Sequence, residues 1–149
     1  KNVYAAGDCS ETLDYISGKN VYRPLGSVAL ESGGIAGENL AGRKTPHPGN
    51  LRIQSDRVFG VKVASIGLTL AEAARLGLEA SYLKLKPPKE VLKETVEMRV
   101  IVGKKDNRIL GFQALGGDLS TRFSELALKA IREGRTLGWL EAKGFKTFE

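Results

Sequence analysis

Apolar and polar positions repeat with two different periods in the second half of the chain, and the change of period separates strands from helices. Every second residue from Val96 to Val102 is apolar, which is the pattern of a strand with one buried face. A second apolar run covers residues 109–115, and the polar segment 104–108 between the two runs predicts an antiparallel hairpin. From residue 119 to 133 the apolar residues recur at helical spacing, which predicts an amphipathic helix that Gly134 ends.

The segment before this hairpin, residues 58–86, also contains sequence patterns typical of strands and of a helix. Residues 58–66 are rich in β-formers, and Thr69 with Glu72 forms a capping box that predicts a helix over 70–76. A second strand is expected over 80–86, and a last short helix is expected after Thr136. These elements together predict a compact α+β fold.

The first 50 residues differ in character. A short apolar strand over 2–6 ends in Gly7 and Asp8. Gly7 lacks a Cβ and lets a ligand approach the backbone, and the Asp8 carboxylate can accept hydrogen bonds from hydroxyls of the sugar type. A loop over 22–27 leads to an expected helix over 28–41, whose glycines indicate that something packs close to its backbone. Residues 43–50, rich in proline and glycine, are the expected linker.

Composition narrows the class of protein. The chain has 149 residues, 42% hydrophobic and 27% charged, as in soluble globular proteins. No apolar run reaches the roughly 18 residues of a membrane span, so we expect no membrane contact. The single cysteine, Cys9, excludes an internal disulfide framework and favours a cytoplasmic location.

The net charge of +6 raises the alternative of a nucleic-acid binder. Acidic residues are interleaved with the lysines over 84–106, and only Tyr82 stands near them as a platform for base stacking. A solvated surface of mixed sign is the better interpretation, so we expect no nucleic-acid partner.

Three blocks, in this order, carry a resemblance to a known family. They are residues 3–9 (Val-Tyr-Ala-Ala-Gly-Asp-Cys), residues 24–29 (Pro-Leu-Gly-Ser-Val-Ala) with 36–42, and residues 64–69 (Ala-Ser-Ile-Gly-Leu-Thr) with 108–111. Together they resemble the C-terminal third of the FAD-dependent pyridine nucleotide–disulfide oxidoreductases. The Pro-Leu-Gly-Ser form is similar to the NADH oxidase and coenzyme A disulfide reductase branch.

The resemblance implies a flavin site in the first part of the chain. Residues 1–50 would be the C-terminal remnant of the FAD-binding domain. Gly7 and Asp8 would lie at the ribityl chain, with Asp8 holding a ribityl hydroxyl. The backbone of Leu25, Gly26, Ser27 and Val28 would face the pyrimidine edge of the flavin ring.

For residues 51–149 the resemblance implies the family's dimerisation domain, an antiparallel sheet flanked by helices, and therefore a homodimer. The parent enzyme would pass electrons from NAD(P)H through FAD to a disulfide, oxygen or a related acceptor. The family's phosphate-binding loops and redox cysteine are not among these residues, so we expect no catalytic residue here and no activity from the chain alone. No metal site is expected.

Less specific interpretations stay open. Asp8 can be a turn residue after a buried strand, and Cys9 without a partner cysteine is expected to be a small buried hydrophobe. His47 is expected to be an exposed loop histidine, and Lys84 and Lys86 a solvated strand end. For the whole chain, the alternative function is a non-catalytic dimerisation or interaction module.

Overall fold

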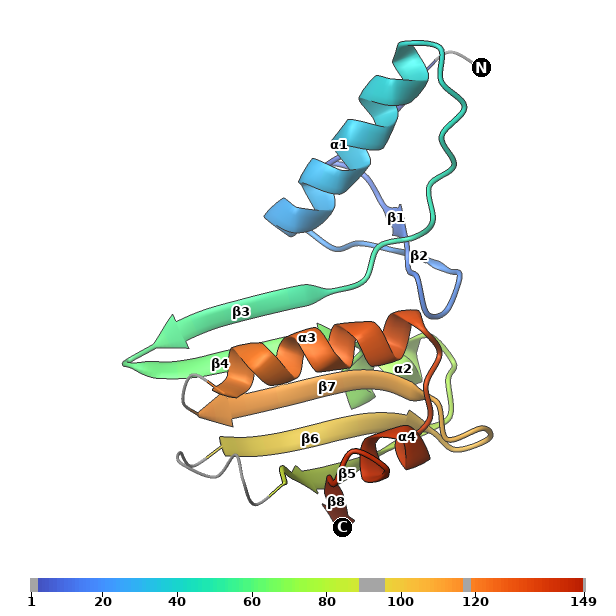
Figure 1. Ribbon diagram of the computed structural model, residues 1–149. Helices are drawn as coiled ribbons and strands as arrows, with labels where there is room; N and C mark the ends of the chain where they lie inside the picture. The colour runs from blue at the N-terminus through green and yellow to red at the C-terminus, as the bar shows by residue number, and fades with distance from the viewer. Residues whose placement is uncertain (1–2, 89–95, 117–118, 149) are drawn as a thin grey trace. The chain divides into compact units, whose positions relative to one another are not determined.

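The computed structural model describes residues 3–88, 96–116 and 119–148 (Figure 1). The chain divides into two compact units, Lys1–Arg52 and Ile53–Glu149. Each unit is described by itself below, as unit 1 and unit 2.

Unit 1 consists of a two-stranded antiparallel ribbon and one helix. Strands β1 (Thr12–Leu13) and β2 (Asn20–Val21) pair with each other, and α1 (Gly26–Leu40) follows. A strand was predicted over residues 2–6. Residues 3–6, the part of it that the structure describes, are irregular, so the prediction is wrong for them. A strand needs a neighbour for its backbone hydrogen bonds, and within the described residues none pairs with this segment.

The helix of unit 1 agrees with the sequence prediction apart from an earlier start, at Gly26 instead of residue 28. Gly42 lies just after the helix with a φ of 89°, the left-handed conformation that commonly ends a helix. The expected linker over 43–50 is irregular as far as Gly49, but its end is fixed. Asn50 is fully buried and forms a β-bridge with Asp14. The end of the expected linker is therefore held by contacts within unit 1, and the two units meet after Arg52 in the sequence.

Unit 2 is an α+β fold built on a six-stranded antiparallel sheet, as predicted (Figure 1). The sheet has the order β3-β4-β7-β6-β5-β8. Its elements are β3 (Ile53–Val58), β4 (Val61–Gly67), α2 (Leu70–Arg75), β5 (Ala80–Lys86), β6 (Val96–Gly103), β7 (Ile109–Gly116), α3 (Leu119–Arg132), α4 (Leu137–Glu141) and β8 (Lys146–Phe148).

One predicted strand is in fact a hairpin. Instead of a single strand over 58–66, β3 and β4 pair in antiparallel register across a turn at Phe59 and Gly60. Both turn residues have positive φ, 48° and 83°. Such two-residue turns favour Asn-Gly or Asp-Gly, and the phenylalanine in the first position hid this turn from sequence reasoning.

Helices α3 and α4 of unit 2 cover one face of the sheet, whereas α2 lies behind β7 in the same view (Figure 1). α3 contacts β4 and β7, and α3 and α4 lie on the same side of the sheet (Figure 1). The apolar side of β6 agrees with the predicted alternation, since Met98, Val100 and Val102 are buried. The rings of Phe123 and Phe145 meet edge to face at 5.5 Å, which confirms Phe123 as a packing residue. This helix-covered side is the core of unit 2.

The capping box at the start of α2 is present as predicted. Thr69 Oγ1 accepts the N–H of Glu72, and the Glu72 carboxylate accepts the N–H of Thr69 at 2.9 Å. We expect Thr69→Ala to lower the free energy of unfolding of unit 2 by about 1 kcal/mol, because one helix N–H loses its acceptor. Urea unfolding followed by the fluorescence of Trp139 measures this loss. A cost below about 0.3 kcal/mol would show that solvent replaces the cap at no loss.

Candidate functional site

A tight turn at Gly7 brings the first predicted site residues onto α1. The Gly7 carbonyl accepts both the N–H and the hydroxyl of Ser10 at 3.1 Å, and the Gly7 N–H donates to Ser32 Oγ at 3.4 Å. Gly7 has a φ of 90°, and a Cβ added there would lie 3.9 Å from the Cβ of Ala29. Gly7 is therefore needed for the turn, and the turn holds Asp8, which is exposed, beside the first two turns of α1.

The start of α1 supplies the other predicted site residues. Leu25 is the N-cap in extended conformation, and no side chain among the described residues caps this helix end. Gly26 and Ser27 are exposed, whereas Val28 is buried and anchors the first turn. The first N–H groups of a helix carry partial positive charge and favour an anionic or polar ligand.

A buried polar cluster fixes the loop between the turn and the helix. Arg23 Nη2 donates to Asp14 Oδ1 at 2.8 Å, and Arg23 Nη1 donates to the Asn50 carbonyl at 3.0 Å. The side chain of Asn50 in turn contacts Thr12 and donates to Glu31 at 2.7 Å. Because Arg23 precedes the N-cap by two residues, this cluster sets where α1 begins. Sequence reasoning missed it, since no local spacing links Asp14, Arg23 and Asn50.

Two other expectations about unit 1 are corrected by the structure. Cys9 is exposed instead of buried, because it belongs to the surface turn after Gly7. His47 is half-buried: its Nδ1 accepts the N–H of Gly49 at 3.1 Å, and its Nε2 is buried without a partner among the described residues.

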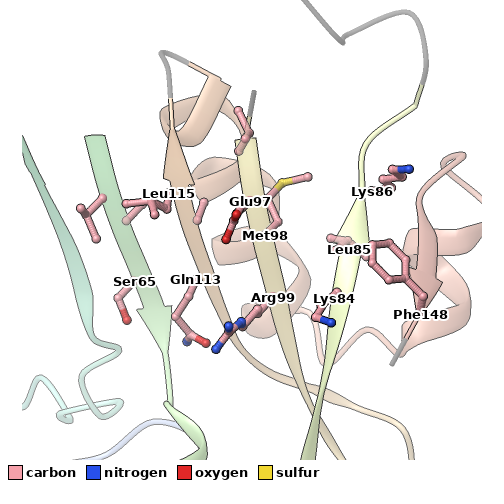
Figure 2. A pocket seen from close by; sticks show the side chains of 14 residues that line it. Ser65, Lys84, Leu85, Lys86, Glu97, Met98, Arg99, Gln113, Leu115 and Phe148 are labelled. Atoms are coloured by element: carbon pink, nitrogen blue, oxygen red, sulfur yellow. The ribbon is translucent and has the colours of Figure 1, made fainter. Parts of the chain in front are cut away.

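The sheet of unit 2 has a second side, away from α3 and α4, where several strand residues are exposed. We call this side the open face and define it by Val63, Ser65, Glu97, Arg99, Gln113 and Leu115. Figure 2 shows Ser65, Gln113, Arg99 and Lys84 in a row across four neighbouring strands, and the strand register pairs them in this order. A groove of about 530 Å³ runs over the same residues.

Aromatic rings at one side of the open face lie under cations. Arg99 sits over the ring of Tyr82 at 5.2 Å, and Lys86 sits over the ring of Phe148 at 5.9 Å. Lys84 and Lys86 are exposed, which agrees with a solvated strand end. Mixed charges therefore occupy the β5–β6 side of the open face.

The described residues also limit which other sites are possible. They contain no group of three His, Cys, Asp or Glu side chains placed to hold a metal ion. None of their helices is long and apolar enough to cross a bilayer.

A six-stranded antiparallel sheet with α3 and α4 on one side defines the class of unit 2 as an α+β domain of the reductase dimerisation type. Residues 55–140 match the model of the pyridine nucleotide-disulphide oxidoreductase dimerisation domain. The chain belongs to this family, which consists of FAD-dependent NAD(P)H oxidoreductases.

Named relatives agree with this assignment. The chain is 33% identical over 131 residues to a CoA-dependent NAD(P)H sulfur oxidoreductase of Pyrococcus furiosus, covering 85% of this chain and 30% of the relative. It is 32% identical over 141 residues to an NADH oxidase of Streptococcus pyogenes, covering 91% of this chain and 31% of the relative. The chain thus spans about a third of the length of these relatives.

A solved structure shares the fold. The NAD-dependent persulfide reductase from A. fulgidus superimposes with a TM-score of 0.79 at 31% identity, over 92% of this chain and 26% of that one. The expectation of the family and of the α+β dimerisation fold is confirmed.

Proposed function

We propose that this chain is part of an FAD-dependent oxidoreductase that passes hydride from NAD(P)H to FAD and onward to a disulfide, oxygen or a related acceptor. The chain supplies one part of the flavin site through Gly7, Asp8 and residues 25–28, and it supplies the contact between two subunits of a homodimer. The observation that carries the flavin assignment is the packing of the Gly7 turn onto α1, because it gathers both predicted segments in unit 1.

The residues of this site fit a flavin in chemical terms. The exposed carboxylate of Asp8 accepts hydrogen bonds from hydroxyls, as a ribityl chain requires. The uncapped N–H groups at the start of α1 favour the negative charge that a reduced flavin carries at its pyrimidine edge. A stabilisation of about 1–2 kcal/mol corresponds to a shift of about 20–45 mV in a two-electron potential.

The remaining chemistry belongs to groups outside this chain. FAD, when bound, supplies the hydride acceptor. We found no phosphate-binding G-x-G-x-x-G loop in the sequence, so both dinucleotides need further residues for their pyrophosphates. We therefore expect the 149 residues alone to oxidise no NADH.

The flavin site is tested in the complete coding sequence that contains this chain. We expect Asp8→Ala to raise the dissociation constant of FAD about 10- to 100-fold, because a charged acceptor of hydroxyl hydrogen bonds is lost. Titration of the apoprotein with FAD, followed by flavin fluorescence, measures this change. Glu11→Ala, which removes an exposed carboxylate three residues away, is the matched control and should leave the constant unchanged. Equal constants for the Asp8 variant and the wild type would contradict the assignment.

A further inference from the structure

Ser32, in the middle of α1, is the residue that hydrogen-bonds the Gly7 turn to this helix. Its Oγ accepts the N–H of Gly7 at 3.4 Å. Within the part of the chain that the structure describes, no other hydrogen bond joins residues 3–11 to α1. The direction in which the turn leaves the helix therefore depends on this one hydroxyl.

The same hydroxyl also reaches the start of α1. Ser32 Oγ lies 2.8 Å from the Val28 carbonyl oxygen and 3.3 Å from that of Ala29. Because a hydroxyl has one proton and two lone pairs, it can donate to Val28 while it accepts from Gly7. Val28 belongs to the first turn of α1, which the proposed function places at the flavin ring. One oxygen atom thus connects the turn that carries Asp8 to the helix start.

The position of the Asp8 carboxylate depends on the backbone of the turn. Asp8 is exposed, and none of the described residues forms a hydrogen bond or an ion pair with its side chain. The contact of Gly7 with Ala29 is an ordinary van der Waals distance, 3.9 Å from an added Cβ, and such contacts have no preferred direction. A hydrogen bond from the peptide N–H is directional, so it fixes the orientation of the turn.

Serine at position 32 does not serve the stability of the helix. Alanine has the higher helix propensity, and a serine hydroxyl bonded to the carbonyl four residues earlier slightly destabilises a helix. Ser32 is half-buried, on the part of α1 that meets the Gly7 turn. Alanine there would leave the Gly7 N–H without its acceptor. The hydroxyl therefore contributes to the position of the turn.

We propose that Ser32 is a positioning residue of the flavin site, which holds the Asp8 carboxylate in register with the first N–H groups of α1. The inference rests on the proposed function and adds a residue outside the predicted segments. A flavin would meet both parts at once, with its ribityl chain at Asp8 and its pyrimidine edge at residues 25–28. A displacement between the two parts weakens at least one of these contacts. Ser32 acts through Asp8 and does not contact the flavin.

Ser32→Ala and Ser32→Thr in the complete coding sequence test this role. Alanine removes the acceptor and favours the helix, so α1 should stay folded. The dissociation constant of FAD should rise about 3- to 10-fold, as expected for one lost hydrogen bond. Threonine keeps a hydroxyl that can bond to the carbonyl four residues earlier, so its constant should lie within about twofold of the wild type. Titration of the apoprotein with FAD, followed by flavin fluorescence, measures the constants, and circular dichroism verifies the fold.

A double-mutant cycle with Asp8→Ala separates positioning from a general loss of stability. If Ser32 acts through Asp8, Ser32→Ala should have little further effect once residue 8 is alanine. Thr45→Val is the matched control. Thr45 Oγ1 donates to Glu38 at 2.6 Å near the other end of α1, and the loss of this bond should leave the constant unchanged.

The outcomes distinguish the role of Ser32 from the flavin assignment. An unchanged constant in Ser32→Ala, fully additive losses in the double variant, or an equal loss in Thr45→Val would overturn the positioning role and leave the flavin site standing. Equal constants for Asp8→Ala and the wild type would overturn the flavin assignment, and the role of Ser32 with it.

Discussion

Replacing Arg23 with alanine should destabilise unit 1 by about 3–5 kcal/mol, because it leaves the carboxylate of Asp14 buried without its cation. The Asp14 side chain is fully buried and that of Arg23 is 6% exposed, so solvent cannot take over the lost contact. Arg23 also holds the carbonyl of Asn50, which loses a donor in the same step. The expected result is local unfolding of the loop 12–23 and release of residue 50.

Hydrogen exchange measures this effect in unit 1 without relying on global unfolding. The N–H of Asn50 donates to the Leu13 carbonyl at 2.7 Å, and the N–H of Tyr15 donates to the Asn50 carbonyl at 3.0 Å. In Arg23→Ala both amides should exchange faster by roughly two to three orders of magnitude.

The matched control for Arg23 is another arginine of the same unit. Arg43 pairs with Glu38 at 3.5 Å on the surface, where its side chain is 72% exposed. Arg43→Ala should therefore cost less than about 1 kcal/mol and leave the two amides protected. Equal protection in both variants would mean that the buried pair contributes little to unit 1.

The second large effect is expected from Gly111→Ala in unit 2. Gly111 and Gly67 face each other across β7 and β4, and the backbones approach closely there. A Cβ added to Gly111 would lie 1.8 Å from the Leu68 carbonyl oxygen, a backbone atom that cannot rotate away. We expect the strands to separate locally and the free energy of unfolding of unit 2 to fall by about 3 kcal/mol or more.

Urea unfolding followed by Trp139 fluorescence measures the Gly111 effect, because the single tryptophan lies in unit 2. Gly138→Ala is the control of the same chemical size. It lies inside α4, and the nearest atom to its added Cβ is Thr136 Oγ1 at 4.0 Å. This variant should be more stable than the wild type by up to about 1 kcal/mol. A small loss for Gly111→Ala would show that β4 and β7 shift apart without penalty.

The fold of unit 2 could be predicted from its sequence because its signals are local. The alternation over 96–102, the Thr69–Glu72 box and the glycine after each helix all depend on residues a few positions apart. The hairpin at Phe59 was not predicted, because phenylalanine occupies a turn position that usually holds asparagine or glycine.

The contacts that shape unit 1 could be predicted from the sequence only in part. A resemblance predicts a site at Gly7, Asp8 and residues 25–28. The structure packs Gly7 against Ala29 and Ser32 of α1, a contact that no spacing in the sequence predicts. The Asp14–Arg23–Asn50 cluster joins residues up to 36 positions apart, so the local pattern of apolar and polar residues cannot predict it. Cys9 was expected to be buried because it lacks a partner cysteine, but burial depends on the turn after Gly7, which leaves Cys9 exposed.

The order of the sheet also has a consequence for the synthesis of the protein. β4 ends at Gly67, yet its inner neighbour β7 begins at Ile109, and β5 meets β8 only at Lys146. During synthesis, more than 40 further residues must therefore be added after β4 before its inner neighbour β7 is available for pairing. During that interval the β3–β4 hairpin is exposed with Phe59 at its tip, and long-range pairing of this kind is slow to form. The nascent chain is thus most vulnerable to aggregation between the emergence of β4 and that of β7.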